Sequence, residues 1–143
     1  MQQNILNTGK KREEMKKVLY IILCTAIFLS CQKADHIGDL GGFWKLLQIE
    51  EVKNDTIIDK REEDCFWAIQ LKMITANKDG KVIGKGRFQH TGDSLFVQMI
   101  QKPGNGKVVG LYSPENERFC VNRLTGKSMV LQSDSVILTF RKF

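Results

Sequence analysis

Residues 65–73, CFWAIQLKM, contain the clearest strand pattern of the sequence, and this pattern decides the fold class. Every second position is apolar, so one face of an extended strand would point inward: Cys65, Trp67, Ile69, Leu71 and Met73. The other face carries more polar positions and ends in Gln70 and Lys72. Asn77-Lys78-Asp79-Gly80 then supplies residues that tolerate the positive φ of a hairpin turn. The stretch therefore predicts a strand of an antiparallel sheet.

The same pattern continues in both directions along the chain. A hairpin is expected over 85–101, with its turn at His90–Asp93 and Leu95, Val97 and Met99 inward. The remaining strands are expected at Phe43–Val52, Leu111–Ser113, Arg118–Leu124, Lys127–Ser133 and Val136–Lys142. Residues 102–110, KPGNGKVVG, read as a long loop. No amphipathic helix competes for the core, so the fold class is all-β.

About eight antiparallel strands in sequence order predict closure into a small up-and-down barrel. Closure removes the unpaired edges that an open sheet would expose. Residues 41–143 form one domain, large enough for a single modest core.

Upstream of this domain, Met15–Cys31, MKKVLYIILCTAIFLSC, resembles a bacterial lipoprotein signal. Its apolar run, Val18–Leu29, is too short for a membrane span, which needs roughly 20 apolar residues. The resemblance implies cleavage after Ser30 and a lipid on Cys31, with Met15 as an alternative start. We expect a signal peptide over 1–30 and a flexible tether over 31–40.

Removal of the signal peptide changes the net charge of the mature chain, and the residue after Cys31 bears on its location. Five of the 22 Lys+Arg and two of the 16 Asp+Glu precede Cys31, so the mature chain keeps 17 basic against 14 acidic residues. These are scattered rather than striped, so nucleic acid is not expected as a partner. In lipoproteins of this kind, Asp after the cysteine marks inner-membrane retention. Gln32 stands there, so we expect an outer-membrane lipid anchor in the cell envelope, on either face.

Cys65 and Cys120 are the cysteines left after processing, in a compartment that permits disulfides. A bridge would close a loop of about 55 residues and stabilise by about 4 kcal/mol in the chain-entropy model. Two free cysteines acting as small hydrophobes are the alternative. Both readings stay open at this point.

The sequences at the two ends of the domain resemble the terminal motifs of lipocalins and related calycin barrels. Gly42-Phe43-Trp44 matches their Gly-x-Trp motif, and Arg141 matches their terminal arginine. The resemblance implies that Arg141 packs over the Trp44 indole and closes one end of the barrel. Cation–π attraction gives such a contact a physical basis of about 0.5–2 kcal/mol.

A longer pattern is similar to the small lipocalin-like lipoproteins of Bacteroidota, a family of mostly unassigned function. It consists of GGFWKLLQIE, FWAIQLKM, GRFQHTGDSL and RFCVNRLTGKSMVLQSDSVILTFRKF. The chain departs from that family by a shorter segment around 102–110. If this segment frames a binding mouth, its shortness argues against ligand binding.

Two functions of different classes follow. An eight-stranded barrel either encloses one small ligand or is filled by its own side chains. In the first case we expect a small apolar ligand, lined by Trp67, Ile69, Leu71, Val97 and Met99. In the second, the barrel is an interaction module for another envelope protein. The interior residues can also be ordinary core.

Enzyme chemistry, cofactors and metals are not expected. His90 is the one histidine of the domain, and neither Asp93 nor the cysteines stand at metal or nucleophile spacing from it. The charged run Asp59–Asp64 mixes both signs in a connecting segment. It reads as a solvated turn rather than a calcium site or a glycosidase pair.

Overall fold

The computed structural model describes residues 9–22, 38–101 and 104–143. The chain divides into two compact units, Met1–His36 and Ile37–Phe143. In the first unit, residues 9–22 form a helix. Among the described residues, no helix has the length and apolarity needed to cross a membrane. Cys31, the cleavage position and tether residues 32–37 lie outside the described residues.

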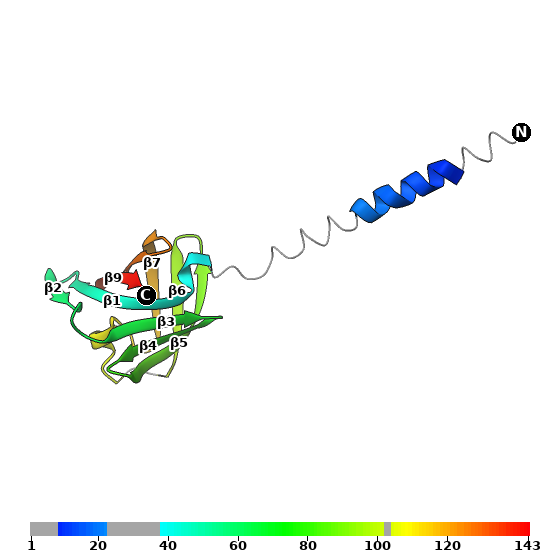
Figure 1. The fold of residues 1–143 in the computed structure, drawn as a ribbon. Helices are drawn as coiled ribbons and strands as arrows, with labels where there is room; N and C mark the ends of the chain where they lie inside the picture. Colours follow the sequence, from blue (N-terminus) through cyan, green and yellow to red (C-terminus); the bar gives the residue numbers. More distant parts are fainter. Residues whose placement is uncertain (1–8, 23–37, 102–103) are drawn as a thin grey trace, which may run out of the picture. The chain divides into compact units, whose positions relative to one another are not determined.

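The second unit consists of strands and two short 3-10 turns (Figure 1). In chain order these are η2 (Gly38–Leu40), β1 (Gly42–Glu51), β2 (Thr56–Asp59), β3 (Cys65–Gln70), β4 (Met73–Lys78), β5 (Lys81–Thr91), β6 (Ser94–Gln101), η3 (Gly106–Val109), β7 (Asn116–Leu124), β8 (Ser128–Gln132) and β9 (Val136–Lys142).

Antiparallel pairing closes these strands into the predicted barrel. From β3 to β9 each strand pairs with the next in sequence, and β1 joins β3 to β9. β1 pairs with β3 over Gly42–Lys45 and with β9 over Trp44–Glu51. The barrel proper therefore has eight strands in the described part of the chain, and β2 lies outside the ring on the remaining edge of β1.

The strand predicted over 65–73 is wrong in one respect, because it is two strands. β3 ends at Gln70, and Gln70 pairs with Met73 across a two-residue turn made by Leu71 and Lys72. Leu71 has a φ of 55°. Turns with positive φ favour Gly or Asn, and neither occurs here, so the sequence carries no turn signal. The turn shifts the alternation of inward and outward side chains by one position. Met73 therefore pairs with the outward-facing Gln70 and does not lie on the core face.

Other elements also differ from the sequence prediction. β2 was not expected, and residues 111–113 are not a strand. The folded domain also begins before Gly41, because η2 belongs to it and Leu40 is fully buried. The flexible tether expected over 31–40 is thus wrong for its last residues. By contrast, β6 and β9 have the predicted bounds.

The barrel has two ends, which η2 and η3 close. Strand directions place η2, the β3–β4 turn and the β5–β6 turn at one end, named here the η2 end. The β4–β5 turn, η3 and the β8–β9 turn lie at the other, the η3 end. Figure 1 shows this arrangement, with η2 in cyan beside the tip of β3 and η3 in yellow on the opposite side.

Candidate functional site

Trp67 lies at the centre of the barrel interior. Its position on β3 points inward because strand residues alternate and Cys65, Trp67 and Ile69 share the buried face. The indole centroid is 4.9 Å from the ring of Phe140 on β9 and 5.9 Å from that of Phe119 on β7. Both pairs are tilted or edge-on, which is the arrangement that aromatic quadrupoles favour.

Four of the five residues predicted to line a ligand cavity lie on or near this interior. Trp67, Ile69 and Val97 are buried, and Met99 is partly buried against the core. Leu71 does not belong to the set: it is 80% exposed in the β3–β4 turn. The unexpected break after Gln70 is the physical reason, since it takes Leu71 out of the strand.

A short segment outside the sheet, Gly106–Tyr112, plugs the η3 end; we call it the plug. Val109 and Leu111 are buried among the core side chains. The Trp67 indole N–H donates to the carbonyl oxygen of Val109 at 2.8 Å. Residues 106–110, which the sequence predicted to be part of a long loop, therefore belong to the core.

Gly110 allows the plug to approach the barrel wall. Its φ of 85° ends η3 in the left-handed conformation. A Cβ at this position would lie 2.7 Å from Cδ2 of Leu138 on β9. Both the backbone conformation and the lack of space therefore require glycine.

Two carboxylates hold the end of the plug. Glu117 on β7 is buried and accepts from the backbone N–H groups of Tyr112 at 3.1 Å and Ser113 at 3.3 Å. Burial raises the pKa of Glu117, while these N–H groups oppose the rise. The Tyr112 hydroxyl donates to Glu51 on β1 at 2.8 Å, which lowers the pKa of Glu51.

A second charged cluster lies beside the plug in the run predicted to be a solvated turn. Glu63 accepts from Lys78 at 2.9 Å and from Lys60 at 3.0 Å. These two ammonium groups, Lys78 first, lower the pKa of Glu63. Lys60 is buried, so this part of the run is a packed ion cluster rather than a solvated one. Among the described residues, no group of His, Cys, Asp and Glu side chains could hold a metal ion.

Cys65 points into the same region and Cys120 does not. Cys65 is buried, with Sγ 3.7 Å from the Val108 carbonyl oxygen, and burial raises the pKa of its thiol. Cys120 is exposed on β7, opposite Ser94 at the η2 end. Both are free, so the disulfide alternative is wrong: one side chain faces the interior and the other faces solvent. A buried protonated thiol is a poor nucleophile.

At the η2 end, closure involves Trp44 as predicted from the motif, but with a different cation. The Trp44 indole N–H donates to the Leu40 carbonyl oxygen at 2.7 Å. Nζ of Lys142 lies 4.9 Å from the Trp44 ring centroid and donates to the Asp39 carbonyl oxygen at 3.0 Å. Arg141 is exposed, so its expected place over the indole is wrong. Trp44 pairs with Lys142 in the β1–β9 register, whereas Arg141 pairs with Lys45 and faces outward.

Gly42 has the role that the Gly-x-Trp pattern requires. Its φ is 128°, and a Cβ would meet Cε of Lys142 at 2.7 Å. The missing side chain therefore leaves room for the lysine stem over the indole. His90, at the end of β5, is exposed in the described structure.

Sequence reasoning missed the residues that join the plug to the barrel: Val109, Leu111, Tyr112 and Glu117. One signal was available. The run Val108-Val109-Gly110-Leu111 is apolar inside an otherwise polar loop. Apolar residues of that density need a buried surface. No local pattern indicates that Glu117 accepts from the backbone.

Comparison with known proteins agrees with this geometry. A family model described as "Lipocalin-like domain" matches residues 25–143. A lipocalin-like protein from Bacteroides uniformis has a similar solved structure, with a TM-score of 0.61 and 23% sequence identity over 74% of this chain and 100% of that chain. An uncharacterized protein from Bacteroides eggerthii has a TM-score of 0.57 and 18% identity over 72% of this chain and 98% of that one. No curated protein matches. The match over most of the chain shows that this protein belongs to the lipocalin-like domain family.

Proposed function

We propose that the chain is a lipid-anchored lipoprotein of the cell envelope, held at the outer membrane through Cys31, whose barrel binds a small apolar molecule at the η3 end. The observation that carries the ligand site is the plug. Val109 and Leu111 enter the interior from outside the sheet, so a ligand can replace them without breaking strand pairing.

The chemistry around the plug limits the ligand class. A displaced plug leaves the Trp67 indole N–H without its acceptor. A ligand therefore needs an apolar body with one hydrogen-bond acceptor, such as a carbonyl or ether oxygen. Glu51 and Glu117, which hold the plug, disfavour an anionic molecule such as a fatty acid carboxylate. The neighbouring ammonium groups of Lys60 and Lys78 are already paired with Glu63. The proposed ligand is uncharged.

The energy of displacement is within reach of such a ligand. Exposing two buried aliphatic side chains costs roughly 1.5–3 kcal/mol each. A ligand that buries a similar apolar area against Trp67 recovers that cost. Affinity then depends on how firmly the plug is held.

A filled barrel that serves as an interaction module for an envelope protein is the second candidate. The close contacts of Trp67 with Phe119 and Phe140 favour it, because side chains of the chain itself already occupy the interior. In this case the plug is permanent and the outer surface carries the function. The two candidates differ in whether the plug can leave.

The experiment uses residues 37–143, which form a compact unit. A solvent extract of the purified unit is examined by mass spectrometry for a stoichiometric neutral compound. Binding of the apolar fluorophore N-phenyl-1-naphthylamine is then titrated. Gly110→Ala weakens the seat of the plug on Leu138, so we expect several-fold tighter binding. Gly126→Ala, where no atom lies within 4 Å, is the matched control.

A second variant tests the interior itself. Val97→Phe enlarges a buried side chain of the interior and should abolish fluorophore binding, while Val82→Phe, on an exposed position of β5, should not. Circular dichroism establishes that each variant is folded. An empty extract together with equal binding by the wild type and Gly110→Ala would favour the filled barrel.

A further inference from the structure

Large apolar side chains are exposed together at the η2 end of the barrel. Leu71 is 80% exposed, Phe143 is 74% exposed and Phe43 is 46% exposed. The Phe143 N–H donates to the Phe43 carbonyl oxygen at 3.1 Å, and both rings lie about 6 Å from that of Phe66. Leu71 stands two residues after Ile69, which pairs with Gly42, so it projects from the same end. Apolar exposure of this kind marks an interaction surface.

Leu71 is placed there against the local preference of the backbone. Its φ of 55° lies in the left-handed region, which favours Gly or Asn. Neither the sheet nor the core explains a leucine at this turn, since its side chain packs into neither. A surface that contacts an apolar phase explains both its identity and its exposure.

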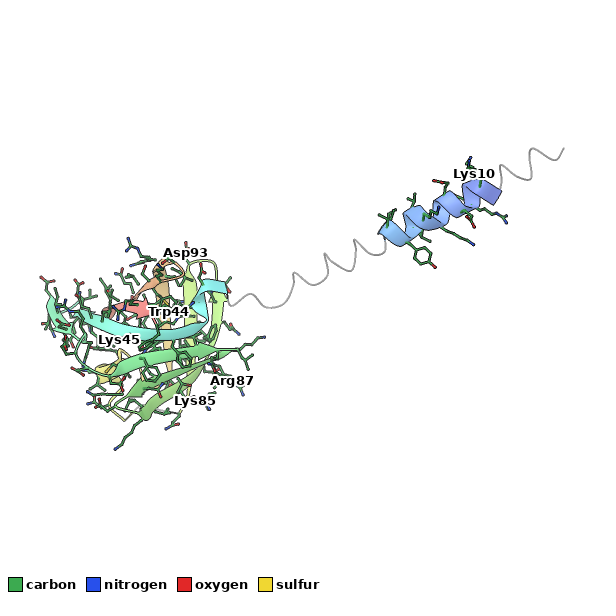
Figure 2. The ribbon with its side chains drawn as sticks, viewed as in Figure 1. Lys10, Trp44, Lys45, Lys85, Arg87 and Asp93 are labelled. Carbon is green, nitrogen blue, oxygen red and sulfur yellow. The ribbon has the colours of Figure 1, made fainter. Side chains whose placement is uncertain are left out.

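Charge separates along the barrel in a way that identifies the surface. Within residues 38–101 and 104–143, Asp39 and Asp93 are the acidic residues at the η2 end, and the other acidic residues lie toward the η3 end. Figure 2 labels Asp93 and, beside the tip of β3, Arg87. The basic residues at the η2 end are Lys45, Lys72, Arg87, Arg123, Lys127, Arg141 and Lys142. The exposed apolar side chains are therefore surrounded by net positive charge.

Chain length adds a constraint, which rests on the proposed lipidation of Cys31. Six residues lie between Cys31 and Gly38, which makes seven Cα-to-Cα steps, and a fully extended chain spans at most about 3.6 Å per step, or roughly 25 Å. Gly38 enters the barrel at the η2 end. An anchored domain thus cannot hold this end far from the bilayer.

We infer that the η2 end docks onto a membrane surface with anionic headgroups, with Leu71, Phe43 and Phe143 entering the interface and the basic residues contacting the headgroups. Docking combines apolar burial with an attraction that salt screens. It leaves the η3 end and its plug directed away from the lipid. The domain then has a fixed orientation rather than swinging on its anchor.

The test uses the full chain, expressed with its signal, purified from membranes and reconstituted into vesicles. Nitroxide labels are attached in a Cys120→Ser background at either end of β8, through Gly126→Cys at the η2 end or Asp134→Cys at the η3 end. Cys65 is buried. Electron paramagnetic resonance measures the accessibility of each nitroxide to a water-soluble paramagnetic relaxation agent. The measurement is made in phosphatidylcholine vesicles and in vesicles of equal parts phosphatidylcholine and phosphatidylglycerol.

In the anionic vesicles at low salt, we expect the label at position 126 to be several-fold less accessible than the label at 134. Leu71→Glu with Phe143→Glu should abolish the difference, while Val82→Glu should preserve it. Equal accessibility of the two labels in a lipidated chain overturns docking and leaves anchoring intact. Shielding that is equal in neutral vesicles and insensitive to salt overturns the role of anionic headgroups. The intact mass reports the lipid on Cys31, and its absence overturns the anchoring together with this inference.

Discussion

The two ends of the barrel are closed by similar contacts but held by different forces. Trp44 and Trp67 are directly paired across β1 and β3, and their indole N–H groups donate to carbonyl oxygens of η2 and η3 at opposite ends. At the η2 end the closing turn runs straight into β1, and Lys142 bonds its backbone. At the η3 end the plug is held by apolar contacts and by Glu117. The first closure is continuous with the sheet, and the second is separable from it.

The largest effect is expected from removing the aromatic centre of the η3 end. Trp67→Ala deletes the contacts with Phe119 and Phe140 and the bond to the plug. Such truncations cost about 3–5 kcal/mol of unfolding free energy. Urea unfolding measures the loss. Val82→Ala, at an exposed strand position, should stay within about 0.5 kcal/mol, and a similar loss in both would contradict the central role of Trp67.

Removal of the plug's acceptor comes next. Glu117→Ala leaves the N–H groups of Tyr112 and Ser113 without their partner, which costs about 1–3 kcal/mol. Hydrogen exchange at these two amides should accelerate. Glu117→Gln retains an acceptor and is the control. Unchanged exchange in Glu117→Ala would mean that the carboxylate does not hold the plug.

The pH dependence of stability separates two carboxylates of the η3 end. The raised pKa of Glu117 means that the folded state keeps its proton where the unfolded state has lost it, so stability falls as pH rises from about 4.5 through the folded pKa. Glu63 has a lowered pKa, so its contribution is present above about 4.5 and is lost as pH falls through the folded pKa. Melting temperatures against pH should show both trends. Glu117→Gln should remove the decrease in melting temperature above about pH 4.5, and Glu63→Gln should remove the decrease below it.

The smallest effect is expected at the η2 end and distinguishes two neighbouring cations. Lys142→Ala loses the contact with the Trp44 ring and should cost about 0.5–2 kcal/mol. Arg141→Ala changes an exposed residue and should stay within about 0.5 kcal/mol. Thermal unfolding compares the pair. The reverse order would restore the arginine closure expected from the lipocalin motif.

Strand alternation was enough to predict the barrel, because an inward face every second residue is a local property. It predicted the bounds of β6 and β9 and the inward faces of Trp67, Ile69 and Val97. It failed at Leu71 because the turn there lacks the residues that normally mark one. The pairing of Gln70 with Met73 ends the strand there, and alternation alone does not reveal that pairing.

The site was harder to predict than the fold because its contacts are nonlocal. Val109 meets Trp67 across 42 positions of sequence, and no periodic pattern connects them. Lys142 replaces Arg141 because the β1–β9 register, set by pairing along the whole strand, decides which side chain reaches the indole. Motif matching gives the residue types, and pairing decides which one is used.

β2 has a consequence for self-association. β1 continues beyond the end of β3, and its residues Gln48–Glu51 would otherwise present bare hydrogen-bonding groups to other chains. β2 covers that stretch with only four residues and ends in the Asp59–Arg61 ion pair. Short, charged edges resist strand addition. This hairpin therefore protects the protein from polymerising edge to edge at high local concentration.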